Sequence, residues 1–238
     1  MARRLFDEWF VHFRFPGHDG HKMVETEHGQ LPEGWEVSAI GDVCVTIRSG
    51  STPSRKRTAL WENGNLDWYT TGELRDRFLQ RSIEQVSPAA ISAGLVRTFP
   101  AGAIFLALYG ASIGRLGVAT AECSCNQAAL AMVPDTRIIG RWYLWECLWR
   151  LKAHFISIAQ GAAQQNISKE KVATTIIVTP PREHTTRFEA AVEPMWGLRE
   201  RLEAQQATLA ASRDLLLPRL ISGELSVIEA ERELDAAA

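Results

Sequence analysis

Long apolar runs and a secretion signal are missing from this sequence. No stretch of 18 apolar residues occurs among its 238 residues, so we expect no membrane-spanning helix. The N-terminal segment carries Asp7 and Glu8 where a secretory signal needs an unbroken apolar core. The few cysteines are typical of reduced, mostly buried thiols (Cys44, Cys123, Cys125 and Cys147). Together these features indicate a cytoplasmic protein.

Complete metal-ligand sets are also lacking. Cys123 and Cys125 form a C-x-C pair, but no second cysteine pair or nearby histidine supplies the remaining ligands. A second group of potential ligands lies in a segment that is typical of a solvated linker without a rigid frame (His18, Asp19, His21 and His28). We therefore expect no metal site.

Signatures of nucleotide-dependent and DNA-modifying enzymes are absent. A P-loop would need a Gly-Lys pair after Gly50, and the segment GASIG (110–114) lacks the third glycine of a dinucleotide-binding motif. The segment TPPRE (179–183) has no amide or acid before its prolines, unlike a methyltransferase catalytic motif, and Pro134-Asp135 lacks the Glu-x-Lys of a metal nuclease. We expect no catalysis and no cofactor; an enzyme with an unrecognised site is the alternative.

Charge is distributed unevenly along the chain, although the formal net charge is only −2. Between Arg48 and Arg115 there are nine basic residues against five acidic ones. The tail after Leu220 carries one basic residue and five acidic ones. A locally basic region favours an anionic partner. On charge alone, a binding face and a random surface fluctuation are both open.

Periodicity and turn signals predict an α+β fold. The region 31–135 shows short strand candidates separated by glycines, which favours a mixed, glycine-bent sheet. The predicted helices are residues 1–15, 140–160, a short one starting at Ser168, and 182–217. Segment 174–181 is predicted to be a strand, and 16–30 a linker. The predicted domains are a helix stump and linker (1–30), a sheet domain with packed helices (31–183), and a helical region (184–238).

The last helix carries a coiled-coil pattern. One apolar line recurs every seven residues, and Leu198 belongs to a second, mixed line that includes Gln205 and Ser212. A seam this regular needs a partner helix. The predicted dimerisation seam is Phe188, Met195, Leu198, Leu202, Leu209 and Leu216. Pro218 is expected to end the helix.

Several segments occur in an order that points to a known family. They are LPEGWEVSAIGDVCVTIRSGSTPS, LDWYTTGEL, FPAGAIFLALYGASIGRLGVA, GAAQQNIS, VTPP and SRDLLLPRLISGEL. This series resembles the specificity (S) subunit of type I restriction–modification systems. RRLFDEWFVHFRFPG resembles the segment that leads from one conserved helix into the second target-recognition domain of such subunits.

The resemblance implies a role in recognition without catalysis. A full S subunit has two target-recognition domains, each of which reads half of a bipartite double-stranded DNA target, and two conserved helices that pair antiparallel. It docks methyltransferase (M) subunits, and restriction (R) subunits join that core. This sequence resembles the C-terminal half of an S subunit, with one recognition domain and one complete helix. It either homodimerises or pairs with another S fragment.

The stretch IRSGSTPSRKR (47–57) raises two possibilities, a nucleotide-phosphate cradle or a loop that grips a DNA backbone. The missing P-loop residues exclude the first. Arg55, Lys56 and Arg57 are the predicted phosphate clamps, and Arg115 could pair with a guanine edge. The full set of predicted DNA contacts is Arg48, Ser49, Ser51, Thr52, Ser54, Arg55, Lys56, Arg57, Thr70, Thr71, Tyr109, Ser112, Arg115, Gln164, Asn166 and Lys169.

Two alternatives to this interpretation remain. The Ser-Gly-Ser-Thr-Pro-Ser core and the amides at 164–166 could serve only to shape the fold. The whole chain could be a degenerate half-subunit that acts as an assembly module through its helix and no longer reads DNA.

Overall fold

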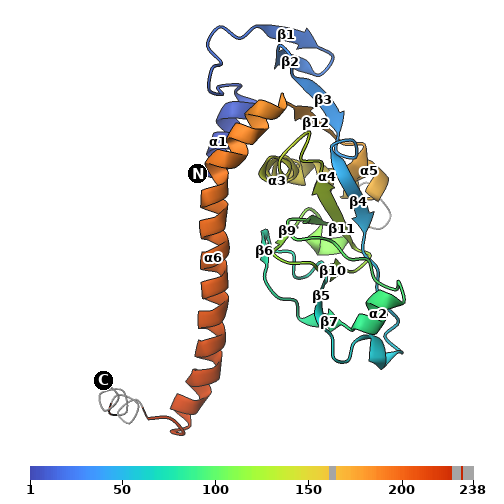
Figure 1. The fold of residues 1–238 in the computed structure, drawn as a ribbon, viewed down its shortest axis with the longest axis vertical. Helices are drawn as coiled ribbons and strands as arrows, with labels where there is room; N and C mark the ends of the chain where they lie inside the picture. Colours follow the sequence, from blue (N-terminus) through green and yellow to red (C-terminus); the bar gives the residue numbers. More distant parts are fainter. Residues whose placement is uncertain (161–164, 227–231, 233–238) are drawn as a thin grey trace. The chain divides into compact units, whose positions relative to one another are not determined.

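The computed structural model describes residues 1–160, 165–226 and 232. The chain divides into two units, Met1–Met195 and Trp196–Ala238. All strands of the described residues lie in the first unit, which combines four small sheets with helices. This arrangement confirms the expected α+β class (Figure 1).

A five-stranded sheet forms the centre of the first unit (Figure 1). Its strand order is β4 (Cys44–Ser49), β11 (Ala129–Pro134), β8 (Ile104–Ala107), β9 (Leu116–Ala119) and β6 (Arg77–Leu79). Neighbouring strands are antiparallel except β6 and β9, which are parallel. Every residue of β8 and β9 is buried, so this sheet is covered on both faces.

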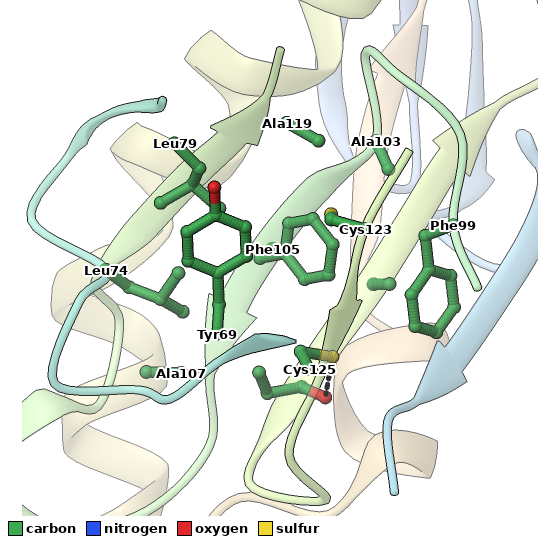
Figure 2. Close-up of a cluster of buried hydrophobic side chains, with 12 residues drawn as sticks. Tyr69, Leu74, Leu79, Phe99, Ala103, Phe105, Ala107, Ala119, Cys123 and Cys125 are labelled. Carbon is green, nitrogen blue, oxygen red and sulfur yellow. Dashed lines mark hydrogen bonds between the residues drawn. The ribbon is translucent and has the colours of Figure 1, made fainter. Parts of the chain in front are cut away.

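Different side chains cover the two faces of this sheet. On one face, Tyr69 and Leu74 join the sheet residues Leu79 and Phe105 in a buried apolar cluster (Figure 2). On β6, Phe78 packs edge to face on Trp142, with ring centroids 5.8 Å apart. Trp142 and Trp145 of α3 therefore belong to the core, each being 1% exposed.

A smaller sheet supports the loops at one end of the unit. Its strand order is β10 (Ser124–Cys125), β5 (Leu66–Tyr69) and β7 (Glu84–Val86), and η2 (Thr58–Leu60) and α2 (Pro88–Ser92) lie beside it. Trp68 is 2% exposed and anchors a separate apolar cluster with Leu60, Val86 and Ala90. The loop 50–57 therefore lies beside a small apolar core that is separate from the core of the five-stranded sheet.

The chain segments before and after the two larger sheets meet in a two-stranded ribbon. Strand β3 (Glu36–Ala39) pairs antiparallel with β12 (Ile176–Thr179), so the start and the end of the intervening chain lie side by side. The strand expected within 174–181 is confirmed. The predicted helix start at Ser168 is also confirmed, because its side chain accepts a hydrogen bond from the Lys171 amide at the start of α5 (Lys169–Ala173).

The linker interpretation of residues 16–30 was wrong. Strands β1 (Met23–Thr26) and β2 (Gly29–Pro32) form a hairpin there. All four β1 residues are exposed or half-buried, so no apolar alternation marks the strand in the sequence. The Thr26 hydroxyl fixes the turn by accepting from the His28 amide and donating to the Gly29 carbonyl.

Two helix boundaries also differ from expectation. The helix predicted over 140–160 is two helices, α3 (Arg141–Arg150) and α4 (Lys152–Gln160), which are separated at Leu151. The N-terminal helix comprises α1 (Ala2–Phe6) and a π-helical turn, η1 (Asp7–Val11). The short helical turn η3 (Gly110–Ser112) follows β8.

Helix α6 (Arg182–Ile221) continues past Pro218, which was expected to end it. A proline lacks an N–H donor, but its carbonyl still accepts, and the Ser222 amide donates to the Pro218 carbonyl at 2.9 Å. Gly223, with a positive φ of 76°, follows the end of the helix. None of the described helices is long and apolar enough to cross a membrane.

Candidate functional site

The loop that follows β4 begins with a close contact between two backbones. A Cβ atom at Gly50 would collide with the carbonyl and thiol of Cys125. The Ser51 amide donates to that carbonyl at 2.9 Å, and the Gly50 amide donates to the Ala129 carbonyl at 3.2 Å. Glycine is therefore required where the loop leaves β4, and the start of the loop is fixed to the strand β10 region.

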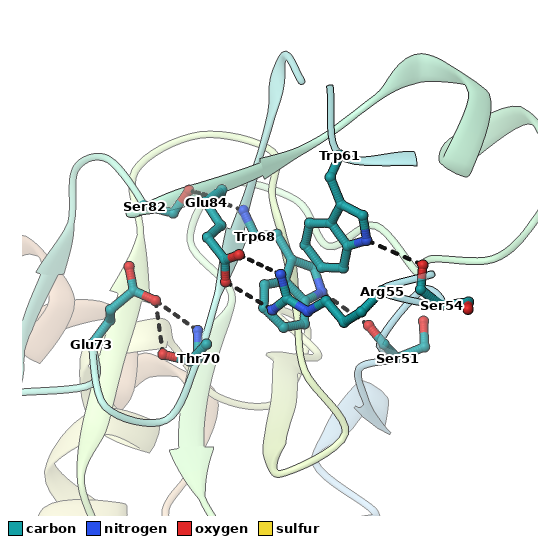
Figure 3. Close-up of polar contacts among 9 residues, drawn as sticks. All are labelled: Ser51, Ser54, Arg55, Trp61, Trp68, Thr70, Glu73, Ser82 and Glu84. Carbon is teal, nitrogen blue, oxygen red and sulfur yellow. Dashed lines mark hydrogen bonds and ion pairs between the residues drawn. The ribbon is translucent and has the colours of Figure 1, made fainter. Parts of the chain in front are cut away.

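Two tryptophan side chains hold the backbone of this loop. The Trp68 indole N–H donates to the Ser51 carbonyl at 2.9 Å, and the Trp61 indole N–H donates to the Ser54 carbonyl at 3.4 Å (Figure 3). The two rings pack edge to face, with centroids 5.0 Å apart. Residues 51–54 are thus tethered at both ends to the small sheet and its flanking turn.

Arg55 points into this tryptophan pair (Figure 3). Its guanidinium lies 3.8 Å from the Trp61 ring centroid and 5.3 Å from that of Trp68. Both terminal nitrogens donate to the Glu84 carboxylate, one of them at 2.9 Å. This hydrogen bonding raises the pKa of Arg55 and lowers the pKa of Glu84. From the sequence, Arg55 was predicted to contact phosphate, and none of its partners Trp61, Trp68 and Glu84 was predicted.

Other predicted cations point to solvent. Arg48, Lys56, Arg57 and Arg115 are exposed, and none of these four side chains has a hydrogen bond or ion pair with another residue that the structure describes. Arg97, which was not among the predicted contacts, donates to the Ser49 carbonyl at 2.7 Å. Lys56 and Arg57 follow Arg55, so of these four cations they lie nearest in sequence to the end of the tethered segment 51–54.

The predicted hydroxyl contacts are mostly used within the fold. The Ser51 hydroxyl donates to the Leu95 carbonyl at 3.0 Å, and the Thr52 hydroxyl donates to the Gln127 side chain. The amide and hydroxyl of Thr70 both donate to Glu73, at 2.8 and 2.9 Å. The neighbouring Thr71 is half-buried, and Ser54 is exposed. For Ser51 and Thr52 these contacts favour the loop-shaping alternative, and Thr70 is held by Glu73 in a similar way.

A second group of predicted contacts is brought together at the end of β8. Tyr109 and Asn166 form an antiparallel bridge, and the Gly110 amide donates to the Gln165 carbonyl at 3.0 Å. Tyr109 is 43% exposed, and Ser112 is half-buried. A surface pocket of about 170 Å³ opens beside Gly110 and Gln165. Lys169 is exposed on α5, and the predicted contact Gln164 lies outside the described residues.

Three of the four cysteines belong to the core. Burial raises the pKa of the Cys123 thiol to about 12, and the Cys125 thiol donates to the Ala129 carbonyl (Figure 2). All four cysteines are free thiols, and three of them are buried. Within residues 1–160, 165–226 and 232, no cluster of three or more His, Cys, Asp or Glu side chains could hold a metal ion.

The predicted seam on α6 divides into a covered part and an exposed part. Phe188 is fully buried against the N-terminal aromatic residues, with its ring centroid 5.2 Å from Phe10 and 5.8 Å from Phe6. It therefore has its partner within the chain, which sequence reasoning did not foresee. Met195 is half-buried. In the second unit, Leu198, Leu202, Leu209 and Leu216 are 51%, 54%, 70% and 42% exposed.

Comparison with known proteins assigns the family. A family model described as "Type I restriction modification DNA specificity domain" matches residues 32–187, which is more than half of the chain. The chain belongs to this family. The matched residues include the loop after β4, the bridge between Tyr109 and Asn166, and the ribbon of β3 and β12. The resemblance stated from the ordered motifs is thereby confirmed.

Curated relatives of this family are distant and longer. The chain is 23% identical over 232 residues to the MjaIX specificity subunit of Methanocaldococcus jannaschii, covering 96% of this chain and 53% of the relative. It is 23% identical over 198 residues to the HindI specificity subunit of Haemophilus influenzae, covering 82% and 42%. It matches the EcoprrI specificity subunit of Escherichia coli at 30% identity, over 41% of this chain and 24% of the relative. The chain thus spans about half the length of the first two relatives.

Solved structures show the same fold relationship. The HsdS subunit from Thermoanaerobacter tengcongensis has a TM-score of 0.55 at 20% identity, over 94% of this chain and half of that one. The S subunit from M. genitalium has a TM-score of 0.63 at 12% identity, over 92% of this chain and half of that one. The α+β domain with its long helix is therefore the fold of half a type I specificity subunit.

Proposed function

We propose that this chain reads one half of a bipartite double-stranded DNA target as a non-catalytic specificity component of a type I restriction–modification complex. Two chains, either identical copies or this one with another S fragment, would supply two readers. Methyltransferase subunits would dock on them, and restriction subunits would join that core. The proposal places the chain in the cytoplasm with its DNA.

The observation that carries this proposal is the loop that follows β4. Its backbone is tethered by two indoles, while Lys56 and Arg57 remain exposed directly after the tethered part. Exposed cations on a fixed loop suit contacts to phosphate oxygens, which position a protein on DNA without reading its sequence. Base reading would fall to exposed side chains nearby, with Arg115 suited to a guanine edge.

Salt dependence of DNA binding tests this proposal. The chain, with its methyltransferase subunits, is titrated onto random-sequence duplex DNA at several salt concentrations. Lys56→Ala with Arg57→Ala should weaken binding to every sequence and reduce the log–log salt slope by about 0.9 for each phosphate that is no longer neutralised. Arg4→Ala with Lys22→Ala removes two exposed cations outside the loop and is the matched control. A slope unchanged by the double alanine variant would contradict the phosphate contacts.

The second candidate function is an assembly module without DNA reading. The exposed leucines of α6 favour it, because they suit pairing with another helix whether or not the loops touch DNA. The same titration separates the two functions. Complex formation with the methyltransferase subunit but no DNA binding beyond that of the subunit alone would support the assembly module.

A further inference from the structure

Arg55 joins three segments that are separate in the sequence. It belongs to the loop after β4, Trp61 follows the η2 turn, and Glu84 begins β7. The guanidinium face lies on the Trp61 ring, and its two terminal nitrogens are occupied by the Glu84 carboxylate. We call Arg55, Trp61, Trp68 and Glu84 the arginine latch.

The donor fork of Arg55 is the part of the side chain that a phosphate would need. An arginine grips a phosphate through the same parallel N–H groups with which it grips a carboxylate. In this structure Glu84 takes both of them, and Trp61 covers a face of the guanidinium. A phosphate that used this pair of terminal nitrogens would have to displace Glu84.

The latch is coupled to the loop backbone by the same tryptophans. The indole N–H groups of Trp61 and Trp68 donate to the Ser54 and Ser51 carbonyls, so the rings that contact Arg55 also fix the backbone just before it. Loss of the latch would release a segment that is otherwise ordered before any ligand arrives. A preordered loop loses less conformational entropy on binding.

We propose that Arg55 is a positioning residue, which holds the loop so that Lys56 and Arg57 meet the DNA backbone, and not a phosphate contact. This inference rests on the proposed DNA-binding function. It reassigns the first residue of the Arg-Lys-Arg run from a phosphate contact to a support of the loop, with a side chain that is 52% exposed. It also gives Glu84, an acid beside a DNA-binding loop, a favourable role.

Glu84→Gln gives the sharpest test, because the two interpretations predict opposite signs. If Arg55 is a positioning residue, the substitution loosens the loop and weakens DNA binding by about 3- to 10-fold. If Arg55 contacts phosphate, removing the competing carboxylate frees its donors and strengthens binding. Glu62→Gln removes the same charge from an exposed position of the neighbouring turn, and tighter binding by Glu84→Gln than by Glu62→Gln would overturn the inference.

Two further variants separate geometry from charge. Arg55→Lys keeps the charge but loses the planar fork, so it should weaken binding as much as Arg55→Ala does. Arg55→Ala with Glu84→Gln leaves the net charge unchanged, and it should lower affinity without changing the salt slope. A slope reduced by about 0.9 in this charge-neutral double variant would instead identify Arg55 as a phosphate contact.

Hydrogen exchange on the DNA-free chain provides a readout that does not depend on the proposed function. Glu84→Gln and Arg55→Lys should speed amide exchange within residues 51–57 and leave the buried strand β8 unchanged. Unchanged exchange in the loop would overturn the latch. If the wild-type chain fails to bind DNA while the loop exchange responds as expected, the proposed function fails and the structural role of Arg55 stands.

Discussion

Arg3 and Glu146 meet across 143 residues of sequence, with the Arg3 Nε 3.2 Å from a Glu146 carboxylate oxygen. Glu146 is 1% exposed, and the Arg3 guanidinium also lies 3.8 Å from the Trp149 ring centroid. The N-terminal helix is therefore an integral part of the first unit, attached to α3 by a buried charge as well as by its aromatic residues.

Arg3→Ala should lower the free energy of unfolding by about 1–3 kcal/mol, because it leaves a buried carboxylate without its partner. The Arg3 side chain is 41% exposed, which keeps the effect below that of a fully buried pair. Urea unfolding measures the change. Arg4→Ala, at an exposed position of the same helix, is the control and should change stability little. Equal stability of both variants would contradict this account.

Glu189 predicts a pH-dependent stability. Its carboxylate accepts from the Tyr143 amide at 2.8 Å near the start of α3, with Arg141 and Glu193 as the neighbouring charges. Burial raises the pKa of Glu189 from 4.5 to about 7. Between these values the folded carboxyl stays protonated while the unfolded one ionises, so stability falls as the pH rises through this window.

Glu189→Gln should remove this fall, which we expect to be on the order of 1–3 kcal/mol. Urea unfolding at pH 4, 5, 6, 7 and 8 measures it, because this series extends below 4.5 and above 7. Glu183→Gln, at a side chain that is 76% exposed, is the control. A stability profile that falls equally with pH in wild type and Glu189→Gln would show that another group is responsible.

Two glycines should respond in opposite directions to the same substitution. Gly50→Ala places a Cβ against the Cys125 carbonyl, and we expect a loss of about 1–3 kcal/mol. Gly197→Ala meets open space within α6 and should gain about 0.5–1 kcal/mol through helix propensity. Thermal unfolding of both variants checks the contrast. A neutral Gly50→Ala would mean that the loop after β4 can shift freely.

The exposed leucines of α6 predict association. Leu202→Glu with Leu209→Glu should abolish self-association or docking of the methyltransferase subunit, because both substitutions place charge in the apolar line. Ala207→Glu with Ala211→Glu changes the opposite side of the same helix and is the matched control. Sedimentation velocity measures the result. A profile that the leucine variant leaves unchanged would contradict the seam.

Helical periodicity and local turn chemistry account for what could be predicted. The long helix, the Ser168 cap and the strand before Pro180 each depend on neighbouring residues, and the structure confirms them. The hairpin at 23–32 was missed because strand β1 buries nothing that would produce an alternating pattern. The helix break at Leu151 carries no glycine or proline signal.

The candidate site was harder to predict, because its contacts join distant parts of the chain. Arg55 and Glu84 are 29 residues apart, and no spacing rule connects them. Phe188 follows the heptad pattern, yet its partners are the N-terminal aromatic residues. In both cases the residue type and its importance were visible in the sequence, while the partner was decided by tertiary packing.

The pairing of β3 with β12 has a consequence for how such a domain can change. The chain leaves this ribbon at Ala39 and returns to it at Ile176, so the segment between these two residues begins and ends at the same pair of strands. Helix α3 lies within this segment and contacts α6 through the Tyr143 amide and Glu189, so an exchange that keeps α3 leaves the start of α6 supported. Under the proposed DNA-reading function, a new sequence preference would then require changes only within this one continuous segment, while α6 stays unchanged.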